Sequence, residues 1–425
     1  MKLPNLRDSM WTSPNARRLL VVSIIDSTGN GAFTSASVVL FSTVLHLRPN
    51  QISQGMAVGA LIGLTCSVLW GMLADRIGVR SVLLSLQLWR AAGFIGYAFV
   101  DNFAGYVAIV IFLGLAERAS PPILLSFVTS AVGEGERLKV AGALRSIRNA
   151  GFTLGALLAS LALLSPGRGS MLVIVLGNSV TFIVAAILLR RITLGPDAKP
   201  VRKAKGEAPD RVSRRPAFLA ATVLTGVISI HRQVLAVGLP LWIVTRDLAP
   251  KSLVSVLIAI NTVVVVLLQV RMTEKSDEAE GAARVLRRAG WLMLICAGLL
   301  AAAAGDLPLT PWTAGALLVL ATLALTFAEM WHAAGQWGLS LLLSPAASRA
   351  KFLSVFQLGS SGLDVTGALI LTALVLPAGA AGWLVFGVVL AVAGQLAPVV
   401  AQWADRERLR HEAAAPGVAE SAVTP

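Results

Sequence analysis

Long apolar runs, separated by short polar segments, constrain this chain more than any other feature. An α-helix needs about 20 apolar residues to cross the roughly 30 Å of hydrocarbon in a bilayer. The sequence offers twelve such runs: 19–45, 52–74, 81–100, 103–131, 140–164, 171–189, 217–245, 252–270, 289–304, 312–343, 352–376 and 380–403. The chain is therefore predicted to be an all-α membrane protein with twelve transmembrane helices.

Composition and charge placement agree with a membrane protein. Only 14% of the 425 residues are charged, against about 25% in soluble globular proteins. With the N-terminus inside, 27 of the 36 lysines and arginines lie in the tails or in loops on the inner side. Because basic residues stay on the cytoplasmic side, both termini are predicted to be cytoplasmic. The net charge of +14 then reflects orientation in the bilayer, and we expect no nucleic-acid partner.

A basic, proline-containing stretch over residues 191–216 divides the runs into six and six. Like charges and prolines disfavour a packed fold, so this stretch is predicted to be a cytoplasmic linker. It would separate an N-terminal six-helix bundle (1–190) from a C-terminal one (217–403), followed by a cytoplasmic tail (404–425). A weak internal repeat supports the division, since a shift of 212 residues places Glu117 on Glu329 and Gly155 on Gly367.

A tight charged turn, GMLADRIGVR over residues 71–80, joins the second and third runs. It resembles the signature loop of the major facilitator superfamily, although a valine replaces one basic residue. The matching residues are Gly71, Leu73, Asp75, Arg76, Gly78 and Arg80. The resemblance implies two pseudo-symmetric six-helix bundles that rock about a midplane site, which is alternating access. It also implies that Asp75, Arg76 and Arg80 act in conformational change rather than in substrate binding.

Ionisable side chains within predicted spans are costly in lipid and point to function. Most of them fall on every third span: Asp26 in the first, Glu117 and Arg118 in the fourth, His231 and Arg232 in the seventh, and Glu329 and His332 in the tenth. In the family that the chain resembles, these four spans line the central cavity. The resemblance therefore implies that these residues face a substrate cavity.

Asp26 and Asn30 are four residues apart and hence share a helix face. A carboxyl group in a low-dielectric cavity is stabilised in its neutral form, which allows proton exchange near neutral pH. This favours a proton-coupling site or a counter-ion for a cationic substrate. The alternative is a structural partner for an arginine such as Arg145 or Arg148. Arg90, in the third span, has no evident partner in the sequence.

The tenth span carries a polar stripe of Glu329, His332 and Gln336 at helical spacing. An imidazole and a carboxylate within reach of each other can pass a proton, and an interhelical hydrogen-bonded contact is the alternative. Arg232 needs an acid partner, for which Asp26 and Glu329 are candidates. Asp364, in the eleventh span, is a further buried acid.

Two other spans carry local motifs. Pro121 and Pro122 remove the helical donors for the carbonyls of Glu117 and Arg118, which predicts a helix break beside two charges; a structural ion pair is the alternative role of that charge pair. In the fifth span, Gly151 and Gly155 form G-x-x-x-G, which permits close helix approach. Exporters of the family follow this motif with proline, where this chain has alanine. Arg145 and Arg148, in the same span, either snorkel or close an inner gate.

Within the family, the chain looks most like the drug:proton antiporters, which export small molecules. A proton taken up by Asp26, Glu117 or Glu329 would release substrate outward. An uptake symporter for a polar or anionic solute and a non-transporting membrane sensor or scaffold are the alternatives. The sequence shows no catalytic set, phosphate loop or metal-ligand cluster, so we expect no enzyme activity, cofactor or metal. We expect a monomer in the cell membrane, as a multi-pass protein of a bacterial inner membrane.

Overall fold

The computed structural model describes residues 13–165, 167–194, 212–250, 253–272, 276, 278–303 and 310–413. All regular structure in these ranges is helical. Most of the predicted linker and the end of the predicted tail lie outside the described residues, as does the side chain of Asp364.

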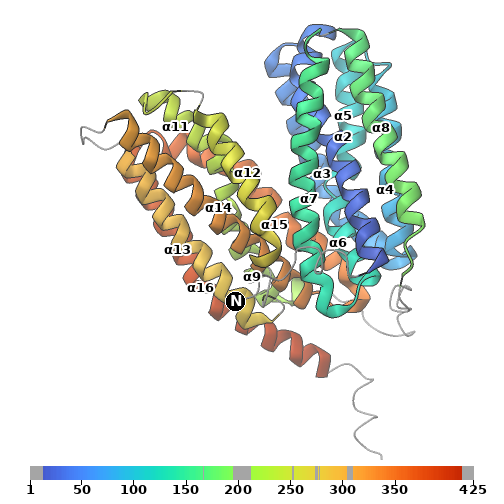
Figure 1. Cartoon of the computed structure of the whole chain (residues 1–425). Helices are drawn as coiled ribbons and strands as arrows, with labels where there is room; N and C mark the ends of the chain where they lie inside the picture. Colours follow the sequence, from blue (N-terminus) through green and yellow to red (C-terminus); the bar gives the residue numbers. More distant parts are fainter. Residues whose placement is uncertain are drawn as a thin grey trace, which may run out of the picture. The chain divides into compact units, whose positions relative to one another are not determined.

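The helices of the N-terminal part are α2 (Pro14–Val44), α3 (Pro49–Ile77), α4 (Val79–Tyr97), α5 (Phe103–Glu117), α6 (Ser120–Ala131), η1 (Glu134–Glu136), α7 (Arg137–Ala162) and α8 (Arg168–Arg190). Those of the C-terminal part are η3 (Val212–Arg214), α9 (Pro216–Ser229), α10 (His231–Gln233), η4 (Val234–Gly238), α11 (Leu239–Arg246), α12 (Leu253–Met272), α13 (Ala279–Ala303), α14 (Pro311–Leu342), η5 (Ala346–Ser348), α15 (Arg349–Ile370), η6 (Leu371–Val375) and α16 (Gly379–Ala413). Figure 1 shows their course.

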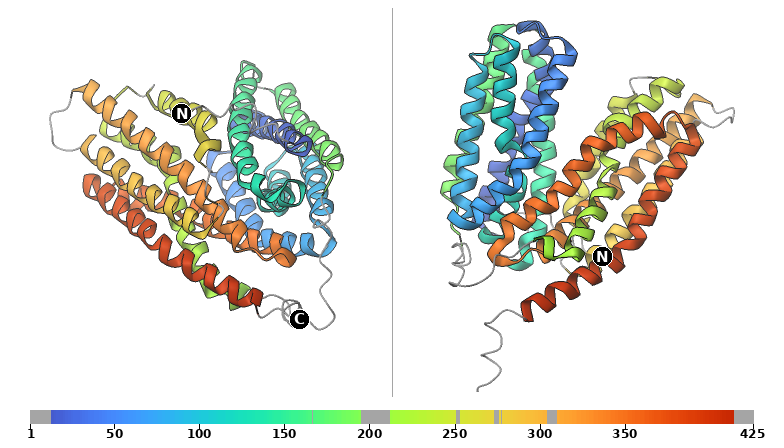
Figure 2. Two further views of the ribbon diagram at one scale, coloured as in Figure 1. Left: turned by 60° about the horizontal axis from the view of Figure 1, so that its bottom comes forward. Right: turned by 180° about the vertical axis from the view of Figure 1, so that it is seen from behind.

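Each predicted apolar run falls on a helix or on a series of abutting helices. Within the described ranges, eight helical segments are long and apolar enough to cross a membrane. They are Gln54–Ile77, Phe103–Ala131, Arg168–Arg190, Pro216–Arg246, Ala279–Ala303, Trp312–Leu342, Ala346–Val375 and Gly379–His411. The all-helical membrane fold is thus supported, and the number of twelve spans stays a prediction. The long helix α16, red in Figure 2, continues past the last predicted span to Ala413.

Proline and glycine set the breaks in these helices. The prediction of a break at the proline pair is confirmed, since α5 ends at Glu117 and α6 begins at Ser120. The carbonyl of Arg118 accepts a hydrogen bond from Ser67 Oγ at 3.5 Å, in place of the donor that proline lacks. Between α3 and α4 only Gly78 intervenes, with φ of 96°, a conformation that glycine adopts without a Cβ clash.

By their contacts, the residues group into two units. The first unit comprises Met1–Lys205, Val266–Val270 and Ala346–Val355, and the second comprises Gly206–Val265, Arg271–Pro345 and Phe356–Pro425. In the first unit α2 packs against α7 and α8, and α4 packs against α8. In the second unit α13 packs against α14 and α16, and α16 also contacts α9. Two short segments from late in the sequence therefore group with the N-terminal helices.

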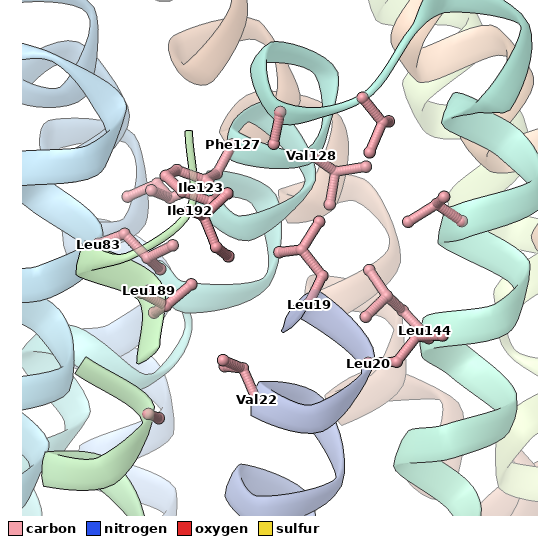
Figure 3. Close-up of a cluster of buried hydrophobic side chains, with 14 of the residues drawn as sticks. Leu19, Leu20, Val22, Leu83, Ile123, Phe127, Val128, Leu144, Leu189 and Ile192 are labelled. Carbon is pink, nitrogen blue, oxygen red and sulfur yellow. The ribbon is translucent and has the colours of Figure 1, made fainter. Parts of the chain in front are cut away.

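A buried apolar cluster holds the first unit together at one end of its helices (Figure 3). It joins Leu19 and Leu20 of α2 to Leu83 of α4, Phe127 of α6 and Leu189 of α8. Because lipid is as apolar as these side chains, such contacts stabilise through close packing rather than through removal of water. The polar groups described next lie further along the same helices.

Candidate functional site

Asp26 lies near the middle of α2, within a polar cluster of the first unit. Arg90 Nη1 of α4 is 3.2 Å from Asp26 Oδ1. Arg90 also donates to Gln87 Oε1 at 3.2 Å and to Asn30 Oδ1 at 3.0 Å, and its guanidinium lies 3.9 Å from the ring centre of Phe182. Asn30 donates to Asp26 Oδ2 at 3.2 Å, and Gln87 donates to Asp26 Oδ1 at 3.3 Å. The carboxylate is thereby held by one cation and two amides.

The structure shows which arginine is the partner of Asp26. Arg90, which had no evident partner in the sequence, forms an ion pair with Asp26, for which Arg145 and Arg148 had been named as possible partners. Gln87 and Arg90 are three residues apart and thus share one face of α4. This spacing is the feature of the sequence that could have indicated a polar face there. Arg148 of α7 is attracted by the negative charge of Asp26 and repelled by the positive charge of Arg90. Arg145 lies half-buried one turn earlier on α7.

The two charged residues at the break between α5 and α6 point in different directions. Arg118 is half-buried beside α3, where a Cβ added to Gly63 would lie 2.8 Å from Arg118 Cγ. Glu117 is exposed at the surface of the first unit. Successive helical residues are turned by about 100°, which accounts for this divergence.

Gly151 and Gly155 of α7 lie where this helix meets α2. A methyl group on Gly155 would clash with the backbone carbonyl of Thr28, and one on Gly151 would clash with the hydroxyl of Ser27. The two backbones therefore approach too closely for any larger residue at these positions.

The charged turn between α3 and α4 is more helical than the sequence indicated. Residues 71–77 complete α3 and residues 79 and 80 begin α4. Asp75 accepts hydrogen bonds from the backbone N–H groups of Ala350 at 2.9 Å and Lys351 at 3.0 Å. These N–H groups lie in the first turn of α15, where a negative charge is stabilising. The whole contact lies within the first unit.

The other residues of this turn differ in their contacts. A Cβ on Gly71 would lie 2.8 Å from the carbonyl oxygen of Ala350, so this glycine lets α3 approach α15 closely. Arg80 donates to the carbonyl of Ile192, just beyond α8. Gly78 provides the left-handed turn, and Arg76 is exposed.

In the second unit, two polar groups surround α14. Asn261 of α12 donates to Glu329 Oε2 and to Thr326 Oγ1, both at 3.0 Å. Arg232 donates to the amide oxygen Oε1 of Gln336 at 3.2 Å. The sequence had suggested only acid partners for Arg232. Asn261 was missed as well, although it is one of few polar residues in its apolar run.

Gln336 in turn donates to Ser360 Oγ of α15 at 3.1 Å. His231 and His332 lie buried in the same unit, with ring centroids 4.9 Å apart. Within the described ranges, no three His, Cys, Asp or Glu side chains come together as metal ligands would.

Comparison with known proteins identifies the family. The sequence profile described as Major Facilitator Superfamily matches residues 19–368. The "Uncharacterized MFS-type transporter YdeE" of Escherichia coli (strain K12) is 24% identical over 363 residues, which are 82% of this chain and 85% of that protein.

Solved structures share the fold at low sequence identity. A bacterial homologue of the iron transporter ferroportin, in an outward-facing state, has a TM-score of 0.70 at 14% identity, covering 92% of this chain and 99% of that chain. The proton:xylose symporter XylE has a TM-score of 0.66 at 12% identity, covering 91% of this chain and 96% of that chain. The chain belongs to the major facilitator superfamily and is a multi-pass membrane transporter of small molecules, not an enzyme.

Proposed function

We propose that this transporter exports a small drug-like or natural-product molecule in exchange for protons, by alternating access. It acts as a monomer in the cell membrane with both termini cytoplasmic, and its relative in Escherichia coli supports a bacterial inner membrane. The assignment to the drug:proton antiporter branch belongs to this proposal.

The observation that supports exchange is the setting of Asp26. Its side chain is 20% exposed, whereas that of Arg90 is only 7% exposed, so the carboxylate is the accessible member of the pair. A proton bound to Asp26 removes the negative charge that balances Arg90 and that acts on Arg148. A cationic substrate would compete with the proton for that same charge, and such competition is what couples the two movements.

Two other acids complete the proposed proton path. Glu329 is half-buried and accepts a hydrogen bond from Asn261, and Glu117 is exposed at a helix break. The hydrogen bond from Asn261 orients the carboxylate of Glu329. The helix break at Glu117 is tolerated in a membrane where water or protein lines it. Arg232 and Gln336 are proposed to face the substrate cavity, whereas the buried His231 and His332 are proposed to act in proton coupling behind its surface.

Proton movement in proteoliposomes tests this proposal. Purified protein would be reconstituted with a pH-sensitive dye and exposed to lipophilic cations, antibiotics and small anions. We expect an antiported substrate to evoke proton movement that disappears in Asp26→Asn or Glu329→Gln. Asp101→Asn is the matched control, because Asp101 lies between α4 and α5 with a 75% exposed side chain. Substrate transport without proton movement would reject proton coupling.

A proton-coupled uptake symporter for a polar or anionic solute is the second candidate. Arg145, Arg148 and Arg232 favour it, because guanidinium groups bind carboxylates and phosphates well. The structural relative XylE is itself described as a proton:xylose symporter. The direction of substrate movement under an imposed proton gradient separates the two candidates: import along the gradient supports the symporter.

A further inference from the structure

Two buried histidines meet in the second unit, one from α10 and one from α14. His231 and His332 are each only 1% exposed. Their ring centroids are 4.9 Å apart and their planes are inclined by 74°, so the edge of one ring faces the other. His231 Nδ1 lies 2.6 Å from the carbonyl oxygen of Ile228, and His332 Nε2 lies 2.9 Å from that of Thr225.

These backbone contacts fix the tautomer of each ring. A carbonyl oxygen only accepts hydrogen bonds, so Nδ1 of His231 and Nε2 of His332 must carry the protons. In the neutral rings, the basic lone pairs then lie on Nε2 of His231 and Nδ1 of His332. Both carbonyls belong to the last turns of α9, just before the irregular stretch that includes the π-helix η4. Such π-helical turns often accompany functional sites.

We propose that His231 and His332 form a single proton-binding site that holds one proton and excludes a second. A second proton would place two positive charges about 5 Å apart in a buried setting, where like charges repel strongly. The edge-to-face arrangement favours one charged ring against one neutral ring, since a cation is attracted to an aromatic face. The site itself goes beyond the proposed carboxylate chemistry; its participation in transport rests on the proposed function.

Three elements carry charged residues at sequence positions next to the pair or in contact with such a position. Arg232 follows His231 directly, and Glu329 lies one turn before His332 on α14. Arg288 of α13 lies 5.6 Å from the ring centre of Trp331, the residue before His332. Helix α9 carries no charged residue, and the first in α16 is Asp405. Helix α15 carries Arg349 and Lys351 in its first turn, and Asp364, whose side chain lies outside the described residues. The positive charge of Arg232 adds to the repulsion that disfavours a second proton.

The chain's four histidines allow a direct test. A background variant, His46→Asn with His411→Gln, removes the two outside the pair. Asparagine suits His46 because φ there is 52°, a conformation that Asn tolerates better than most residues. Nitrogen NMR of histidine-labelled protein in detergent would then report on the intact pair alone. We expect one Nδ1–H ring and one Nε2–H ring at high pH, and uptake of a single proton as the pH is lowered over the range in which the protein stays folded. Uptake of two protons, or of none, would overturn the proposal.

Conservative substitutions sharpen this test. His231→Asn keeps a donor near the position of Nδ1, and His332→Gln keeps one near that of Nε2, so both backbone hydrogen bonds can persist. In the background variant, each single substitution should still leave one proton bound, and the double substitution none. Complete loss of the proton on removing one particular ring, with no loss on removing the other, would contradict a shared site, because the proton would then belong to a single histidine.

Transport assays distinguish this inference from the proposed function. If the pair binds one proton but transport is independent of the proton gradient, the proposed function fails and the proton site stands. If transport is proton-coupled while the pair binds two protons or none, this inference alone fails.

Discussion

The two units of this transporter hold their buried polar groups by different means. In the first unit, the ion pair of Asp26 and Arg90 is enclosed by two amides. In the second unit, the rings of His231 and His332 are bound to backbone carbonyls, and the amide of Asn261 contacts Glu329. Removing one member of a buried ion pair exposes the full cost of the other charge. A histidine bound through one nitrogen can instead change charge and keep its hydrogen bond. We therefore expect stability in the first unit to depend on charge balance, and in the second on hydrogen bonding.

The largest effect is expected from removing Arg90. Arg90→Leu leaves the Asp26 carboxylate without its ion-pair partner, and should lower the free energy of unfolding by about 3 kcal/mol. Chemical denaturation in detergent, followed by tryptophan fluorescence, measures this loss. Adding Asp26→Asn should recover at least half of it, because the unbalanced charge is then removed. If the two losses simply add, charge balance does not govern this unit.

Helix packing provides a second comparison. Gly155→Ala forces a methyl group against the Thr28 carbonyl, and we expect a loss of about 1–3 kcal/mol. Gly290→Ala in the second unit should cost less, since its methyl group would lie 2.9 Å from the Leu390 carbonyl oxygen. Gly177→Ala has nothing within 4 Å and serves as the control, with no loss expected. Equal losses at all three glycines would show that these contacts do not limit packing.

Each unit also has a helix N-terminus held by a distant carboxylate. Asp75 accepts from two N–H groups of α15, whereas Glu407 accepts from one in α9, that of Ala217, at 3.2 Å. Asp75→Ala should therefore remove about 1–2 kcal/mol, and Glu407→Ala somewhat less. Hydrogen exchange should accelerate at Ala350 and Lys351 in the first variant, and at Ala217 in the second. Unchanged exchange at Ala350 in Asp75→Ala would contradict the capping role.

The sequence predicted the helices better than it predicted their polar contacts, for a physical reason. Apolar length and the proline pair at 121 and 122 act locally, and the corresponding helix and break are present. The partner of Asp26 depends on which helix lies beside α2, and spacing along one helix reveals a face but not its neighbour. The three-residue spacing of Gln87 and Arg90 was nevertheless a readable sign of a polar face on α4. Similarly, the contact between Asn261 and Glu329 joins distant helices, and only the fold brings them together.

The smallest effect is expected at Asn261. Asn261→Ala removes the hydrogen bonds to Glu329 and Thr326, while the Thr326 hydroxyl keeps its own bond to the Thr322 carbonyl at 2.6 Å. Hydrogen bonds between membrane helices contribute about 0.6 kcal/mol on average, so a loss of about 1 kcal/mol is expected for the two. Thr262→Ala, at the neighbouring position, is the control for shortening a polar side chain in α12. A loss at Asn261 as large as that in Arg90→Leu would mean that the second unit also depends on charge balance, because only an unbalanced Glu329 charge would make a neutral amide so important.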